Sequence, residues 1–352
     1  MHPDSEGRRW LKQVLPTLPV DPSLYPQQID LEQNLALMIQ MAEEDYERAA
    51  FLDERVISPS TRGSWLPLRG LLEMRGRIRR HLPPAWLFHI GHCGSTLISR
   101  LLGAHPHLLA LREPATLQML AYARRAADQE TGPELLELCL ALLSRSFRET
   151  QRAFIKPTSD CSNLIELLLG TDREAPAILL YVSLETYAAT MLRAAALRAD
   201  IENRHPARSR DLELRLGKPA QASTNDAQRV AVSWLSSMSA FAQAANACAN
   251  RVMWLDFDDF LASPQQYLGE AAAFLGAPLA ADDAATLVTG PLMQRYSKNP
   301  AKGYTAAIRQ EQLRDSRDRC GDEIGAAIDF AENLGKRFAA IATLHEHFQR
   351  PD

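Results

Sequence analysis

The sequence predicts an α/β fold with an open parallel sheet that helices cover on both faces, and three observations lead to this expectation. Short apolar runs that are typical of buried strands alternate with longer segments of helical spacing. A tight, glycine-bearing turn joins one of these strands to the next helix. The length of 352 residues and the apolar content of 46% suffice for one large domain with extensions, or for two domains.

We expect three parts along the chain. Residues 1–80 are predicted to form an N-terminal helical extension, because residues 30–56 carry apolar side chains at helical spacings. This helix would pack on the main domain, or else form a dimer face or a substrate cap. Residues 81–304 are expected to form the α/β core, and residues 305–352 a C-terminal helical segment. The polar, arginine-rich residues 199–226 look like an insertion, either a solvated loop or a flap over an active site.

Five apolar runs within the core have the length of buried strands, and helical patterns separate most of them. The crossovers between such strands should be right-handed. Polar groups that follow the strands emerge at the same carboxyl edge of the sheet, where ligands bind in open parallel sheets. The predicted strands are residues 85–90, 108–112, 153–156, 177–182 and 251–257.

Composition limits the function classes. The net charge of −4 gives no global basic field, so we expect neither a nucleic-acid partner nor an anionic membrane partner. The five cysteines are odd in number and scattered, which is typical of a reduced cytoplasmic protein without structural zinc. The N-terminus lacks a signal peptide's apolar segment, and no stretch reaches the ~18 apolar residues of a membrane span. We therefore expect a soluble, cytoplasmic protein whose anion sites are local.

The turn after Ile90 has the layout of a phosphate-binding loop. Gly91 and Gly94 allow the backbone to turn and to approach an anion, and Ser95 and Thr96 open the next helix. The first amides of that helix are unpaired and its dipole favours negative charge. The segment therefore binds phosphate, or it is a plain strand-to-helix turn. It lacks the Gly-Lys-Ser/Thr ending that a nucleotide hydrolase needs.

The whole pattern, GHCGSTLISRLL followed by HPHLLALREP, resembles the 5′-phosphosulfate loop of the sulfotransferase family. The resemblance covers roughly residues 85–304 and is strongest at residues 94–97. It implies a P-loop-like fold of the bacterial type, and 3′-phosphoadenosine 5′-phosphosulfate (PAPS) as co-substrate without a metal. It also implies a small-molecule or glycan acceptor that offers a hydroxyl or an amine. The residues that it implies around the phosphosulfate are Gly91, His92, Cys93, Gly94, Ser95 and Thr96.

Three residues are candidates for catalysis. His92 stands where the family has a lysine or arginine, so its ring must be protonated or donate a proton to the leaving oxygen; otherwise it only caps a backbone group. Glu113 resembles the base of some bacterial sulfotransferases, or else it is a salt-bridged residue at a helix start. Lys156 at a strand end could stabilise the transferring sulfuryl group, or it only braces the loop.

The resemblance also implies a site for the 3′-phosphate. Ser183 stands at the family's arginine position, Thr190 near its serine position, and Arg193 one turn further on. The basic segment 293–305 resembles the family's glycine-containing loop over this phosphate, although a solvated loop is the alternative. Its candidate donor-binding residues include Lys298, Lys302 and Gly303, and Trp234 and Tyr304 are candidates for stacking on adenine. Asp256, Asp258 and Asp259 are interpreted as turn and cap residues, so no metal site is expected.

Three functions compete at this stage. The first is a PAPS-dependent sulfotransferase. The second is a non-catalytic nucleotide- or protein-binding module on a degenerate sulfotransferase fold, with the helical extensions available for a homodimer. The third, an ATP-dependent kinase or hydrolase, is the weakest because the loop has no Gly-Lys-Ser/Thr ending.

Overall fold

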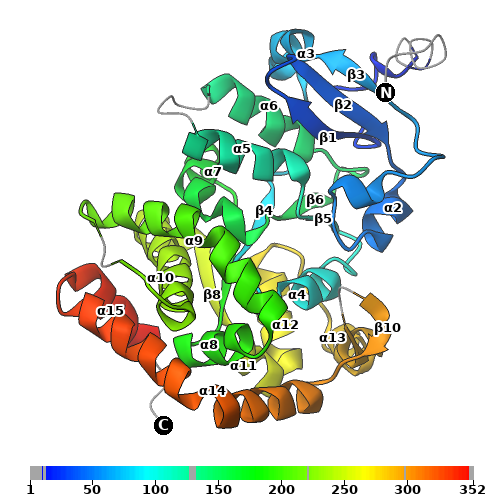
Figure 1. The fold of residues 1–352 in the computed structure, drawn as a ribbon. Helices are drawn as coiled ribbons and strands as arrows, with labels where there is room; N and C mark the ends of the chain where they lie inside the picture. The colour runs from blue at the N-terminus through cyan, green and yellow to red at the C-terminus, as the bar shows by residue number, and fades with distance from the viewer. Residues whose placement is uncertain (1–9, 11–12, 127–131, 220–221, 297–298, 349–352) are drawn as a thin grey trace.

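The computed structural model describes residues 10, 13–126, 132–219, 222–296 and 299–348. Its centre is a parallel sheet in the order β5-β6-β4-β7-β8 (Figure 1). The sheet confirms the α/β class, and its strands match the five predicted runs to within one residue at each end. They are β4 (Ala85–His89), β5 (Leu108–Arg112), β6 (Arg152–Lys156), β7 (Ala177–Tyr181) and β8 (Val252–Asp256).

The strand order reverses at β4, which has β6 on one side and β7 on the other. The chain first runs outward to β5, returns to β6, and then crosses to β7 and β8. In an open parallel sheet such a switch point leaves a crevice at the carboxyl ends of the strands. The loop after β4 therefore lies at the place where this fold class binds ligands.

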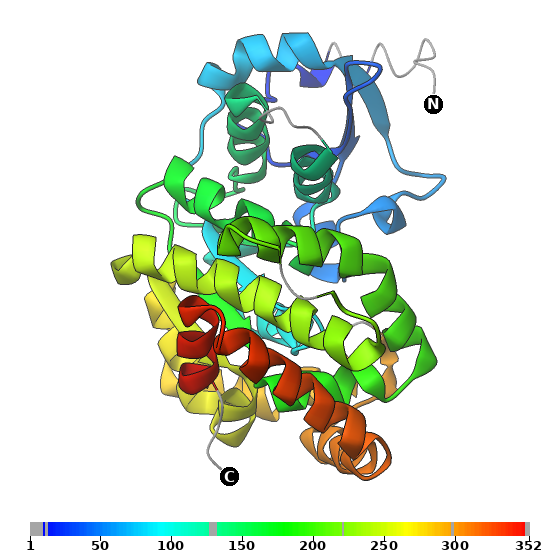
Figure 2. The same cartoon turned by 60° about the vertical axis from the view of Figure 1, so that its left-hand side comes forward.

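Helices cover both faces of the sheet, and its strands are buried accordingly. Leu87, Ile155 and Leu179 are 0% exposed, which explains the near-continuous apolar runs in the sequence. Figures 1 and 2 show two groups of helices on opposite faces. The first group is α4 (Ser95–Leu102), α11 (Phe257–Ala262), α12 (Pro264–Phe274) and α13 (Ala281–Thr289). The second group includes α7 (Ile165–Thr171), α8 (Leu184–Leu192) and α10 (Asp226–Ala247).

The first eighty residues differ from the prediction. Residues 24–74 form an antiparallel sheet of three strands with short helices, so the expected helix over residues 30–56 is wrong. The run 35–40 is apolar at almost every position and is buried as a strand, and Asn34 turns the chain before it with φ of +54°. The elements are β1 (Leu24–Asp30), β2 (Leu35–Gln40), α2 (Glu43–Arg48), β3 (Gly63–Pro67) and α3 (Leu68–Met74).

This small sheet packs on two helices of the core, α5 (Ala115–Ala126) and α6 (Pro133–Leu143), as Figure 1 shows at the upper end of the molecule. Tyr25 of β1 donates a hydrogen bond from its hydroxyl to the carbonyl of Leu52 at 3.0 Å. The backbone N–H of Leu52 in turn donates to the carbonyl of Arg112 at 2.6 Å. The N-terminal residues are thus joined to the edge of the central sheet.

The region predicted as an insertion is mostly helical. Helix α9 (Ala195–Leu216) spans residues 199–216, so the expectation of a loop is wrong there, although Pro206 lies inside the helix. Ile201 and Leu212 are buried, and α9 packs along α10. Asp200 and Arg204 also form an ion pair one turn apart, which supports the helix at a site where propensity alone predicts a break.

The C-terminal residues are helical, as predicted. Helix α14 (Ala306–Gly335) packs on α8 and α10, and α15 (Ala339–Phe348) folds back on α14 (Figure 2). A short hairpin of β9 (Arg295–Tyr296) and β10 (Asn299–Gly303) precedes them. Among the described residues, no helix combines the length and the apolar character that crossing a membrane requires.

Candidate functional site

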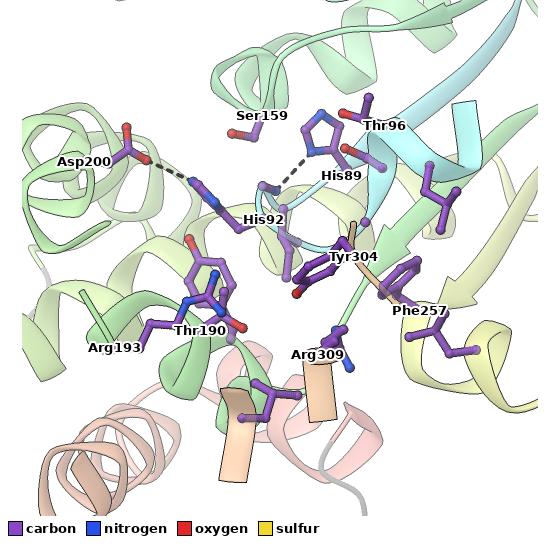
Figure 3. A pocket seen from close by; sticks show the side chains of 18 of the residues that line it. His89, His92, Thr96, Ser159, Thr190, Arg193, Asp200, Phe257, Tyr304 and Arg309 are labelled. Carbon is purple, nitrogen blue, oxygen red and sulfur yellow. Dashed lines mark hydrogen bonds and ion pairs between the residues drawn. The ribbon is translucent and has the colours of Figure 1, made fainter. Parts of the chain in front are cut away.

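A cavity opens at the carboxyl ends of the central strands, and the loop after β4 forms its floor (Figure 3). Helices α8, α9 and α14 contribute its walls. The predicted residues among those that line it are Gly91, His92, Gly94, Ser95, Thr96, Glu113, Thr190 and Arg193, with Tyr304 from the adenine candidates. Lining residues that the sequence did not single out include His89, Ser159, Tyr187, Asp200, Arg204, Arg208, Phe257 and Arg309.

The loop has an unusual backbone that its glycines explain. Gly91, His92 and Gly94 all have positive φ, at +88°, +51° and +78°. A Cβ on Gly94 would lie 2.1 Å from the ring of Phe257, so this position requires glycine for space as well as for conformation. The loop therefore brings its backbone close to α11 and starts α4 at Ser95, with the helix amino terminus at the cavity.

His89 fixes the entry to this loop. Its Nδ1 accepts a hydrogen bond from the N–H of Gly91 at 3.1 Å, and its Nε2 lies 3.0 Å from the carbonyl oxygen of Pro157. The ring is therefore the tautomer that carries its proton on Nε2. This histidine ties the loop after β4 to the segment after β6, and Figure 3 shows its ring beside the loop, with a dashed line to the loop backbone.

Thr96, one of the residues that line this cavity, carries a buried hydroxyl that has no protein partner among the described residues. The residue is 4% exposed, and its Oγ1 has no hydrogen-bond partner among the described residues. An unmade hydrogen bond at a buried hydroxyl costs free energy, so such groups in native proteins call for an explanation. A ligand oxygen bound at the start of α4 would supply the missing partner.

His92 is paired across the cavity with helix α9. Its Nε2 lies 3.3 Å from Asp200 Oδ2, as the dashed line in Figure 3 shows. Arg204 donates from Nε to the other oxygen of Asp200 at 2.8 Å, and it also pairs with Asp160 at 2.6 Å. The hydrogen bond from His92, together with Arg204, holds the pKa of the Asp200 carboxyl well below its ordinary value.

Glu113 and Lys156 form an ion pair at the ends of β5 and β6. Glu113 lines the cavity and has φ of +54°, and its N–H donates to the carbonyl of Lys156 at 2.6 Å. The Lys156 side chain is 0% exposed and lies outside the cavity lining. Glu113 can therefore contact a ligand in the cavity, whereas Lys156 is buried outside the cavity lining and contacts the carboxylate of Glu113.

The residues predicted around the 3′-phosphate are only partly together. Thr190 and Arg193 line the cavity, whereas Ser183 caps α8 by accepting from the N–H of Thr186 at 3.2 Å. Arg193 donates to the side-chain oxygen of Gln312, which also accepts from the hydroxyl of Tyr304 at 3.4 Å. Figure 3 shows Tyr304 in the middle of the cavity.

Other predicted residues lie elsewhere. The Cys93 thiol is buried and contacts the carbonyl of Leu180 at 3.6 Å, and burial raises its pKa to about 12. Trp234 is 1% exposed and donates from its indole to Val182, so stacking of adenine on Trp234 is excluded. Gly303 ends β10 outside the cavity lining, whereas Lys298 and the side chain of Lys302 lie outside the described residues.

Arg309 at the start of α14 is a cation that the sequence did not indicate. It is 8% exposed, pairs with Asp258 at 2.5 Å, and lies over the ring of Phe257 at 5.3 Å. Asp256 accepts from the N–H of Asp258 at 2.7 Å, which confirms that it caps α11. Among the described residues, no group of three or more histidine, cysteine, aspartate or glutamate side chains is arranged to hold a metal ion.

Comparison with known proteins found similarity to solved structures. No known protein family matches the sequence, and no curated protein is similar to it. The chain is similar to a sulfotransferase domain from the curacin biosynthetic pathway, with 13% identity, a TM-score of 0.40, and coverage of 69% of this chain and 99% of that one.

Two further solved structures are similar to the same degree. One is a sulfotransferase domain from a Synechococcus olefin synthase, with 13% identity, a TM-score of 0.39, and coverage of 67% of this chain and 95% of that one. The other is a sulfotransferase from Mycobacterium tuberculosis, with 13% identity, a TM-score of 0.39, and coverage of 70% and 78%. The fold class assigned above rests on the strand order of this chain itself.

Proposed function

We propose that this protein is a sulfotransferase, which moves a sulfuryl group from PAPS to a hydroxyl or an amine. The observation that carries the proposal is the Thr96 hydroxyl, which is buried at the start of α4 and has no protein partner in the part of the chain described. Together with the loop amides it suits a phosphate or phosphosulfate oxygen. The loop has no lysine, which fits a reaction that leaves the nucleotide phosphates intact.

The residues present fit the parts of this sulfuryl donor. Loop residues 91–96 would hold the 5′-phosphosulfate, and Thr190, Arg193 and Arg309 would hold the 3′-phosphate from the opposite wall. Phe257 and Tyr304 are aromatic residues of the lining, as is Tyr187 of α8, and the ring of Phe257 or of Tyr304 could stack on adenine. The arginines supply planar, permanently charged groups for phosphate.

Glu113 is the proposed base for the acceptor. In the transfer, the bond between sulfur and the phosphate oxygen of the donor breaks, and a bond from sulfur to the acceptor oxygen or nitrogen forms. The acceptor proton passes to the carboxylate of Glu113, which lines the cavity after β5. Lys156 would hold that carboxylate in place through the ion pair.

A test by titration calorimetry separates this proposal from a nucleotide hydrolase or kinase. We expect the bisphosphate product, 3′-phosphoadenosine 5′-phosphate (PAP), and PAPS to bind with micromolar-class affinity whether or not Mg²⁺ is present. At about 100 times its dissociation constant, PAP should add roughly 2.7 kcal/mol to the free energy of unfolding. Binding of Mg-ATP without binding of PAP or PAPS would overturn the proposal.

The second candidate function is a non-catalytic module that binds the nucleotide and does not turn it over. Two departures from the family's pattern favour it, because His92 stands at the position of the loop cation and Ser183, at the position of the family's arginine, is engaged in capping α8. Release of PAP from PAPS in the presence of mixed small hydroxyl and amine acceptors would decide between the two. The enzyme reading predicts release that Glu113→Gln abolishes while PAPS still binds; the module predicts none from either protein.

A further inference from the structure

The contact between His92 and Asp200 joins the phosphate loop to α9, 108 residues further along the chain. The carboxylate of Asp200 is held from both sides, since His92 Nε2 lies 3.3 Å from Oδ2 and Arg204 donates to Oδ1 at 2.8 Å. Arg204 is held in turn by Asp160 at 2.6 Å. Arg204 on the same helix, together with His92 and Asp160 from two other segments, thus fixes where the carboxylate of Asp200 lies relative to the loop.

This arrangement restricts how the His92 ring can meet an anion. Asp200 stays ionised because its contacts with His92 and Arg204 hold its pKa below the ordinary range. An ionised carboxylate only accepts hydrogen bonds, so His92 must keep a proton on Nε2. If the ring is neutral, Nδ1 then carries a lone pair, which repels an anion. Only the doubly protonated ring has an N–H at Nδ1 to offer.

We propose that Asp200 is a positioning residue that holds His92 as an imidazolium, so that the loop gains the positive charge that its sequence lacks. This inference rests on the proposed function, and it assigns the role of the missing loop lysine to His92 with its partner Asp200. The ring would bind the phosphosulfate only in its charged form, and affinity for the sulfuryl donor is therefore coupled to the protonation of His92.

The neighbouring charges are compatible with this role. Arg204 is engaged by two carboxylates, Asp200 and Asp160, and Arg309 pairs with Asp258. Among the described residues, the carboxylate within hydrogen-bonding distance of the His92 ring is that of Asp200. The charged and titratable groups that share the cavity with His92 are Asp200, Arg204 and Arg208 of α9, Tyr187 of α8, Arg193 just after α8, and His89, Glu113, Arg295, Tyr304 and Arg309.

The test is the affinity for PAPS of the full-length protein, measured by calorimetry from about pH 5 to about pH 8, where histidine titrates. In the wild type, affinity should fall as the pH rises across this range, because only the doubly protonated ring offers an N–H at Nδ1. Asp200→Asn removes the negative partner of the ring, so the fall in affinity should begin at a lower pH than in the wild type. Asp200→Glu should restore the wild-type pH dependence. The ionisation of the ligand's own phosphate is common to all variants and cancels in the comparison.

Two controls separate positioning from a general effect. Glu202→Gln removes a negative charge from the exposed side of the same helix and should leave the pH profile unchanged. In His92→Lys the loop carries a charge throughout this pH range, so adding Asp200→Asn to it should leave the affinity for PAPS unchanged. A pH profile of Asp200→Asn that equals the wild type's, or equal losses of affinity in both backgrounds, would overturn the inference. Failure of the wild type to bind PAPS at any pH would instead overturn the proposed function.

Discussion

At the scale of single residues, two buried threonines form a useful pair. Thr96 and Thr116 are 4% and 0% exposed, and neither hydroxyl has a partner among the described residues. Thr96 lines the cavity at the start of α4, whereas Thr116 lies in the first turn of α5 and outside the cavity lining. Of these two threonines, Thr96 is the one whose hydroxyl a ligand in the cavity could supply with a partner.

We predict that Thr96→Val stabilises the ligand-free protein and weakens binding of PAP. Valine has nearly the same shape and removes the unsatisfied hydroxyl, so the free energy of unfolding should rise by about 1 kcal/mol. The lost hydrogen bond to a charged ligand should cost roughly 1–3 kcal/mol of binding free energy. Urea denaturation and calorimetry measure the two effects separately.

Thr116→Val is the matched control for this prediction. It should raise the free energy of unfolding by a similar amount and leave the affinity for PAP unchanged. If Thr96→Val binds PAP with wild-type affinity, the Thr96 hydroxyl does not contact the ligand. Its burial would then result from packing alone, like that of Thr116.

Sequence reasoning found the loop residues because they are contiguous. The glycines and hydroxyl residues of segment 91–96 determine a local backbone conformation, so the segment's own sequence suffices to predict it. Asp200, Arg204 and Arg309 were missed for the opposite reason. They reach the cavity through contacts with distant parts of the chain, such as Arg309 with Asp258, and no local spacing reports such contacts. The signal that was available in the sequence is the four-residue spacing of Asp200, Arg204 and Arg208, which places them on one face of a helix.

At the scale of elements, the loop between β4 and α4 depends on Gly94 for two separable reasons. One is its φ of +78°, which costs any other L-residue roughly 1–2 kcal/mol. The other is the ring of Phe257, which would lie 2.1 Å from an added Cβ. Since Phe257 of α11 also packs beside Arg309 of α14, its ring contacts both the loop and α14.

We predict that Gly94→Ala destabilises the protein by more than its backbone strain and abolishes binding of PAP, because the ring must move and the loop with it. Gly217→Ala supplies the comparison, since this residue caps α9 with φ of +67° and has nothing within 4 Å of its added Cβ. It should cost only about 1–2 kcal/mol and leave binding intact. Thermal denaturation and calorimetry of both variants check this.

A smaller side chain in place of Phe257 tests whether the ring is what excludes a side chain at Gly94. Gly94→Ala should lose less stability in a Phe257→Leu background than in the wild type, since the leucine leaves room for the added methyl group. Equal losses in the two backgrounds, or equal losses in Gly94→Ala and Gly217→Ala, would show that the ring does not constrain the loop.

Two predictions of secondary structure were wrong, and each has a physical reason. Residues 35–40 carry apolar side chains at positions that satisfy a helical period and a continuous buried strand alike, and pairing with β1 and β3 decides between them. Residues 199–216 contain Pro206 and many charges, which predict a loop. Burial of Ile201 and Leu212 and ion pairs on α9 outweigh this local preference.

At the scale of the whole molecule, two buried arginines attach the N-terminal sheet to the core. Arg145, just after α6, donates to the carbonyls of Leu18 and Asp21 at 2.7 Å and of Leu24 at 2.5 Å. Arg112 at the end of β5 donates to carbonyls at the end of α2, including that of Ala49 at 2.7 Å. Burial lowers the pKa of both arginines to about 10, so their guanidinium groups remain charged at neutral pH.

These contacts explain why the sequence predicted a separate N-terminal part. The central sheet was predictable from its apolar runs, because burial on both faces leaves a direct trace in composition. Attachment through backbone carbonyls leaves no such trace, since any residue type supplies a carbonyl. We therefore expect residues 24–80 to unfold together with the core, although they form a sheet of their own.

The last prediction tests this cooperativity with Arg145→Met, which keeps the length and apolar stem of the side chain and removes its donors. The carbonyls of Leu18, Asp21 and Leu24 would remain buried without this partner, so the free energy of unfolding should fall by roughly 3–5 kcal/mol. Unfolding followed by circular dichroism should remain a single transition. Arg148→Met is the matched control, because Arg148 reaches the same N-terminal part through Glu43 while 46% of its side chain is exposed, and its loss should cost at most about 1 kcal/mol. If Arg145→Met instead splits the transition in two, with cleavage of the first eighty residues by trypsin before the core melts, the N-terminal sheet is an independent unit and its arginine contacts serve only to orient it.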